Sequence, residues 1–95
     1  MSQTLLEPDI NLENQGSGRW MVVIFNNDTN SMDEVIDILI KATHCDIEEA
    51  MIEMWEAHTF GKAPVHFSSR STCEEIALVI RTVGIKTEVC PEWDD

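Results

Sequence analysis

The chain has 95 residues, of which 43% are apolar, and its 18 acidic side chains against 6 basic ones give a formal net charge of −12 at pH 7. This length suits one domain rather than two, and the apolar content is enough for one modest core. Nucleic-acid binding depends on clustered Lys and Arg side chains, so the charge argues against it. The charge favours cationic partners, or simply keeps the protein soluble.

The three cysteines, Cys45, Cys73 and Cys90, are far apart, and none belongs to a Cys-x-x-Cys pair. Because the usual spacings of zinc and redox sites are missing, we expect reduced thiols in a cytosol-like compartment. The first residues contain neither the basic nor the apolar segment of a secretory signal, and no apolar run approaches a membrane span in length. The sequence therefore predicts a cytoplasmic protein.

Residues 1–19 are polar and acidic and contain Pro8, Gly16 and Gly18. This composition predicts a flexible N-terminal arm before a core domain of residues 20–95. Residues 20–26 are apolar at almost every position, which is typical of a strand covered on both faces. We expect this strand to lie in the centre of a sheet.

Three helices are predicted next, over about 32–43, 47–58 and 72–83. Each predicted start has a capping residue with Glu three positions later: Ser31, Asp46 and Ser71. In the capping box, the cap oxygen and the Glu carboxylate each accept a backbone N–H that the helix leaves unpaired.

The second predicted helix has an apolar stripe at helical spacing, which we expect to face the core. Its acidic side is expected to face solvent. The stripe consists of Ile47, Met51, Met54, Trp55 and His58, and the acidic side of Glu49, Glu53 and Glu56.

Two further strands are predicted by alternation. Ala63, Val65 and Phe67 are expected to point inward, with Pro64 marking an edge strand because proline donates no ladder hydrogen bond. The last strand covers about 85–90. The fold class is therefore α+β: a single small domain with a three-stranded antiparallel sheet and three helices packed on one face, in the order β-α-α-β-α-β.

The first strand ends at polar residues that can bind a small cation. An α-ammonium group has three N–H donors and no acceptor, so a site for it needs two or three accepting atoms. Asn26 offers a carbonyl oxygen, Asp28 a carboxylate and His58, when neutral, one ring nitrogen. Each has a simpler explanation: Asn26 and Asp28 can form a turn, and His58 can sit at a helix end beside the dipole.

Apolar residues on the first two helices can line a pocket beside these acceptors. Met32 and Val35 are three apart on the first helix, and Met54 and Ala57 are three apart on the second, which places each pair on one face. The link between the helices is short, so their faces can meet beside the strand end. The alternative is that these residues belong to the core.

The segment at 26–37, Asn-Asn-Asp-x-x-x-Met-Asp-x-Val-Ile-Asp, resembles the Asn-Asp-Asp-x-x-Pro-Met-Glu-x-Val signature of the ClpS family. The segment His58-Thr-Phe-Gly-Lys-Ala63 is similar to the family's His-x-x-Gly-x-Ala. ClpS proteins are adaptors of the Clp protease that recognise N-degrons. The resemblance covers about residues 20–83.

The resemblance implies an adaptor that binds proteins whose first residue is Leu, Phe, Tyr or Trp. Such an adaptor delivers them to the N-terminal domain of a ClpA- or ClpC-type AAA+ unfoldase in the bacterial cytoplasm. By matching position, Asn26, Asp28 and His58 would hold the α-amine. Met32, Val35, Met54 and Ala57 would line the side-chain pocket. We expect a monomer with no cofactor, no metal and no catalytic residues.

Four departures from the family pattern bear mainly on the preferred first residue and on the unfoldase contact. Asn27 stands where Asp is frequent, Ala57 where a larger aliphatic residue is common, and Ser31 where Pro is usual. The third helix begins Cys-Glu-Glu-Ile where Lys is frequent.

Three other functions could use parts of this sequence. A general protein-interaction module could share this fold, as in the C-terminal domain of the ribosomal stalk protein, without N-degron specificity. A small enzyme could use His58 with Asp28, but no nucleophile elbow or phosphate loop is present. A metal site from His44, Cys45, His58 and His66 has none of the common ligand spacings.

Overall fold

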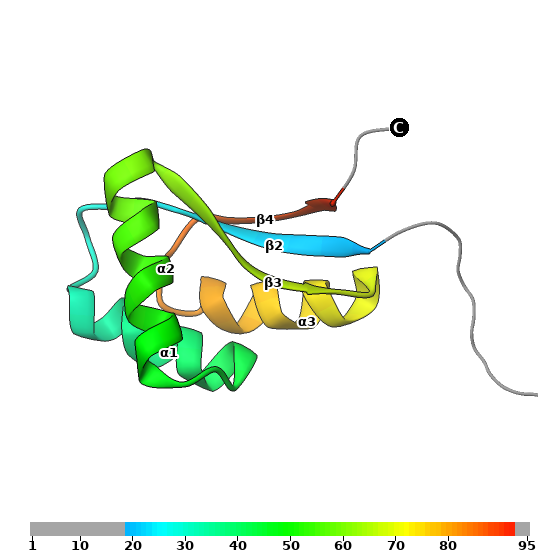
Figure 1. Cartoon of the computed structure of the whole chain (residues 1–95), viewed down its shortest axis with the longest axis horizontal. Coiled ribbons are helices and arrows are strands. Elements are labelled where there is room, and N and C mark those ends of the chain that lie inside the picture. Colours follow the sequence, from blue (N-terminus) through cyan, green and yellow to red (C-terminus); the bar gives the residue numbers. More distant parts are fainter. Residues whose placement is uncertain (1–18, 93–95) are drawn as a thin grey trace, which may run out of the picture.

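The computed structural model describes residues 19–92, so almost all of the predicted N-terminal arm and the last three residues lie outside the described part. The elements follow the predicted order: β2 (Trp20–Phe25), α1 (Met32–Thr43), α2 (Ile47–Phe60), β3 (Lys62–Ser68), α3 (Arg70–Arg81) and β4 (Thr87–Pro91). The three strands form one antiparallel sheet in the order β3-β2-β4. The three helices pack on one side of it (Figure 1). The predicted α+β class is confirmed.

Strand β2 is central, as its unbroken apolar run predicted. It pairs with β3 on one side and β4 on the other. Val22 and Ile24 point to the helices and are fully buried, and Val23 on the opposite face is only 7% exposed. The end of β2, and with it the loop that follows, is therefore fixed by both neighbouring strands.

The first two predicted helix caps are present. The Glu34 N–H donates to Ser31 Oγ at 3.1 Å, and the Glu34 carboxylate accepts from the Ser31 N–H at 3.0 Å. The Glu49 N–H donates to Asp46 Oδ1 at 2.8 Å. Losing one such cap costs about 1 kcal/mol. The first of these caps also fixes where α1 begins, next to the loop after β2.

The prediction that Ser71 caps the third helix is wrong. Helix α3 begins two residues earlier, with Ser69 as its cap, and the Thr72 N–H donates to Ser69 Oγ at 3.3 Å. Strand β3 ends at Ser68, so one residue suffices to join the two elements. The earlier start also includes Arg70, which pairs with Glu74 at 3.1 Å along the exposed side of the helix.

The predicted inward face of α2 is also wrong. Ala50, Glu53 and Ala57 face the core, whereas Ile47 is 59% exposed and Trp55 is 57% exposed. Alanines at i and i+7 are small enough to let α2 approach α1 and β3 closely, and this contact sets the rotation of the helix. As a result, the larger apolar side chains on the neighbouring face of α2 are exposed to solvent, and the carboxyl group of Glu53 is buried.

The alternation predicted for β3 breaks at a β-bulge. Val65 has no partner in the ladder, and the register shifts between Val22 and Val23. Because a bulge reverses the inward and outward order beyond it, Phe67 pairs with Met21 on the open face instead of joining the core. The Arg19 guanidinium lies 5.5 Å from the centre of the Phe67 ring.

Candidate functional site

The loop that joins β2 to α1 is built by the side chains of two asparagines. Asn27 Oδ1 accepts from the N–H groups of Thr29 at 3.1 Å and Asn30 at 3.0 Å, the pattern of an Asx turn. Asn27 Nδ2 donates to Asn30 Oδ1 at 2.9 Å. Both ends of the Asn27 amide are thus occupied within the loop, and an aspartate there could not donate the second bond.

Two longer-range hydrogen bonds anchor this loop to the rest of the fold. Asn30 Nδ2 donates to the carbonyl of Val83, in the turn after α3, at 2.8 Å. The Asn26 N–H donates to the carbonyl of Gly61, just beyond α2, at 2.9 Å. The loop that carries the side chains of Asn26 and Asp28 is therefore held by hydrogen bonds near both of its ends.

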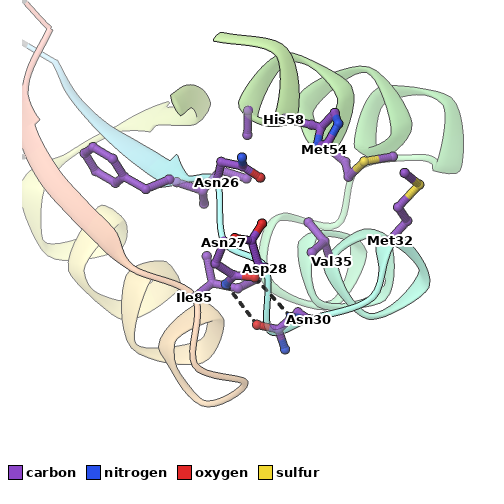
Figure 2. A pocket seen from close by; sticks show the side chains of 12 residues that line it. Asn26, Asn27, Asp28, Asn30, Met32, Val35, Met54, His58 and Ile85 are labelled. Carbon is purple, nitrogen blue, oxygen red and sulfur yellow. Dashed lines mark hydrogen bonds between the residues drawn. The ribbon is translucent and has the colours of Figure 1, made fainter. Parts of the chain in front are cut away.

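A cavity of about 160 Å³ opens between this loop and helices α1 and α2 (Figure 2). All seven residues predicted for the site line it. The full lining is Ile24, Phe25, Asn26, Asn27, Asp28, Asn30, Met32, Val35, Met54, Ala57, His58 and Ile85. None of these twelve, all within the described part of the chain, is Lys or Arg, so the lining contains no permanently positive side chain that would repel a cation.

The three predicted acceptors lie around the cavity with their side chains available. Asn26 and Asp28 project from the loop, and His58 projects from the facing helix α2 (Figure 2). Within residues 19–92, none of these three side chains makes a hydrogen bond. His58 lies in the last turn of α2, where the helix dipole is negative. A positive group placed among them would gain acceptors and a favourable field.

The apolar half of the cavity comes from both helices and from the sheet side. Val35 on α1 and Met54 on α2 are half-buried walls, and Ala57 is buried. Met32, at the first position of α1, is 58% exposed and forms the rim. A cavity of about 150 Å³ lined by apolar side chains accepts one benzene-sized group. This cavity therefore suits a single large apolar side chain.

Five lining residues were not predicted as site residues. Ile24 and Phe25 reach the cavity from the end of β2, and Ile85 reaches it from the turn before β4. Ile85 carries no local signal, since it joins the cavity only through the fold. Asn27 and Asn30 do carry a local sequence signal, because two asparagines three positions apart after a strand are typical of a turn stabilised by side chains.

Other site types find no support in the described residues. No group of three or more His, Cys, Asp or Glu side chains in residues 19–92 is arranged to hold a metal ion. The cysteines, all within the same range, form no disulfide bond. Of the helices that the structure describes, none is both long and apolar enough to cross a membrane.

Comparison with known proteins decides the family. The model of the ClpS family, described as ATP-dependent Clp protease adaptor protein ClpS, matches residues 15–87, which is more than half of the chain. The chain belongs to the ClpS family. The match spans the whole loop after β2, both helices of the cavity and β3, and it confirms the resemblance carried by the two sequence motifs. By its description, this is a family of adaptors of the Clp protease.

A solved structure agrees with this assignment at the level of the fold. The chain is similar to Agrobacterium tumefaciens ClpS2, whose structure was determined bound to L-phenylalaninamide. The TM-score is 0.74 at 22% sequence identity, over 79% of this chain and 98% of that one. A search among curated proteins found no match. The ClpS fold is therefore shared with a distant relative.

Proposed function

We propose that this ClpS-family adaptor binds the free α-amine and the bulky apolar first residue of an N-degron substrate. The first residue would be Leu, Phe, Tyr or Trp. The observation that carries the proposal is the cavity itself. A ring-sized apolar pocket has three hydrogen-bond acceptors around it that no side chain or backbone donor in residues 19–92 occupies.

The amine half of the proposal follows from the cost of burying charge. An ammonium partly removed from water without partners loses several kcal/mol. Asn26, Asp28 and His58 supply one acceptor for each of its three N–H donors, and Asp28 supplies the opposite charge. Asn26 has an amide as well and can also donate to the first peptide carbonyl.

The side-chain half follows from the size and lining of the cavity. Met32, Val35, Met54 and Ala57 surround a space that a Leu or Phe side chain fills, and filling it contributes about 1.5–3 kcal/mol. The similarity to ClpS2, which was solved with phenylalaninamide bound, supports an aromatic first residue. Small first residues would leave the cavity partly empty and bind weakly.

Delivery is the second part of the proposal. The adaptor, acting as a monomer in the bacterial cytoplasm, docks on the N-terminal domain of a ClpA- or ClpC-type AAA+ unfoldase and hands over the substrate. Its residues 1–19 assist that step. Membership of a family of Clp protease adaptors supports this role.

The test compares a Phe-initiated peptide with its N-acetylated twin by isothermal titration calorimetry. Acetylation removes the positive charge and two donors and leaves the side chain unchanged. The proposal predicts binding of the free peptide and loss of nearly all affinity for the acetylated one. Equal affinities would instead favour a general protein-interaction module of the same fold without N-degron specificity.

A further inference from the structure

The cavity does not account for an exposed apolar row on α2. We call Ile47, Met51 and Trp55 the α2 stripe; they follow one another at intervals of four residues and so lie along one side of the helix. Each is about half exposed or more, from 49% for Met51 to 59% for Ile47. Large exposed apolar patches are typical of interaction sites, and this row is the start of such a surface.

The rotation of α2 ties this exposure to the cavity. Turning the helix to bury the stripe would also bring Glu53 out of the core, where its Oε1 atom has no hydrogen-bond partner. The same turn would move Met54, Ala57 and His58 away from the cavity that they line. The observed orientation thus buries a carboxyl group and exposes a tryptophan, and it keeps the cavity intact.

The α2 stripe is continuous with the cavity. Met51 is three residues from Met54, and Trp55 is three residues from His58, so both are direct neighbours of cavity residues on the helix surface. From Met54 back to Ile47 the helix rises about 10 Å. An extended chain advances about 3.3 Å per residue. Three residues of an extended peptide therefore cover this length.

We propose that the second to fourth residues of the bound substrate lie along the α2 stripe and that apolar side chains are selected there. This inference rests on the proposed function, because the first residue in the cavity places the rest of the chain. Glu48, exposed on α2, lies three residues from Met51 and borders the stripe. Together with the net charge of −12 it disfavours acidic residues at these substrate positions.

The experiment uses the full chain and two Phe-initiated peptides with free amines. One has Leu-Val-Leu at positions two to four, and the other has Ser-Gly-Ser. Burying even one further side chain predicts about tenfold tighter binding of the apolar peptide to the unmodified protein. In the double variant Met51→Gln with Trp55→Gln the advantage falls below about twofold, while affinity for the polar peptide is unchanged.

The matched control is Leu78→Gln, which removes an equally exposed apolar side chain (62%) from α3. It leaves the affinities of both peptides unchanged. Equal binding of the two peptides to the unmodified protein overturns the inference, and so does an equal loss for both in the double variant. A dimer seen by sedimentation that the double variant abolishes assigns the stripe to a second copy and also overturns it.

The acetylated twin of the polar peptide separates this inference from the proposed function. If the free polar peptide binds and its acetylated twin does not, the cavity binds the α-amine as proposed. The role of the α2 stripe is then decided only by comparing the affinities of the apolar and the polar peptide. If the polar peptide and its twin bind equally, the proposed function fails, and the inference that depends on it fails too.

Discussion

Replacing Glu53 by Gln should stabilise the protein at neutral pH, by an amount that grows as the pH rises. The Glu53 side chain is only 5% exposed on the inner face of α2, and its Oε1 atom is buried without a partner. Burial, and then the hydrogen bond and the charge of Glu49 and the charge of Glu56, raise the pKa of Glu53 from 4.5 to about 9. The folded protein therefore keeps this carboxyl protonated at pH 7.

The magnitude follows from proton linkage. Between pH 4.5 and 9 the folded state holds a proton on Glu53 that the unfolded state has released, so stability falls as the pH rises. Each pH unit in this interval costs about 1.4 kcal/mol, which amounts to about 3 kcal/mol at pH 7. Gln has nearly the shape of protonated Glu and no proton to lose, so it avoids this cost.

The assay is urea unfolding of the wild type and Glu53→Gln at pH 5, 6, 7 and 8. Subtracting the unfolding free energy of the wild type from that of the variant removes the contribution of all titrating groups that the two proteins share. This difference should be below about 1 kcal/mol at pH 5 and rise by about 1.4 kcal/mol per pH unit. Glu75→Gln, which removes an exposed carboxylate from α3, is the control for the loss of one surface charge. A pH-independent difference for Glu53→Gln, or a variant less stable than the wild type at pH 8, would show that Glu53 is not held protonated in the folded protein.

Three further predictions concern the binding site. Asp28→Asn should weaken binding of a Phe-initiated peptide by about 1.5–3 kcal/mol in calorimetry, because a charged acceptor is lost, with unchanged urea stability; unaltered affinity would remove Asp28 from the amine site. Met32→Ala should open the rim and improve binding of Ile- or Val-initiated peptides relative to Leu, and an unchanged ranking across Leu, Phe, Trp, Ile and Val would count against a rim role. Deleting residues 1–15 should leave peptide affinity intact but slow degradation by the partner Clp protease; a loss of peptide affinity would place this segment in the site.

Much of the fold was predictable because its signals are local. The apolar run of β2 indicated a central strand, and Ser31 and Asp46 marked two helix starts that the structure confirms. The seven predicted site residues do line one cavity, because a strand end and two helices joined by a short link have few ways to meet. Their roles in binding remain predictions that the experiments above test.

The errors came from features that only tertiary contacts determine. Periodicity showed a stripe on α2 but could not show that Ala50 and Ala57, being small, would occupy the inner face in its place. The bulge at Val65, which turns Phe67 outward, depends on pairing with β2. The bond from Asn30 to Val83 joins residues 53 positions apart and leaves no mark on the local sequence.

The most direct test of the proposed function is a crystal structure of the full chain with a Phe-initiated peptide. The α-amine should lie within hydrogen-bond distance of Asn26, Asp28 and His58, with the phenyl ring between Met32 and Met54. A peptide bound elsewhere on the protein, or one whose amine points to solvent while its ring fills the cavity, would contradict it.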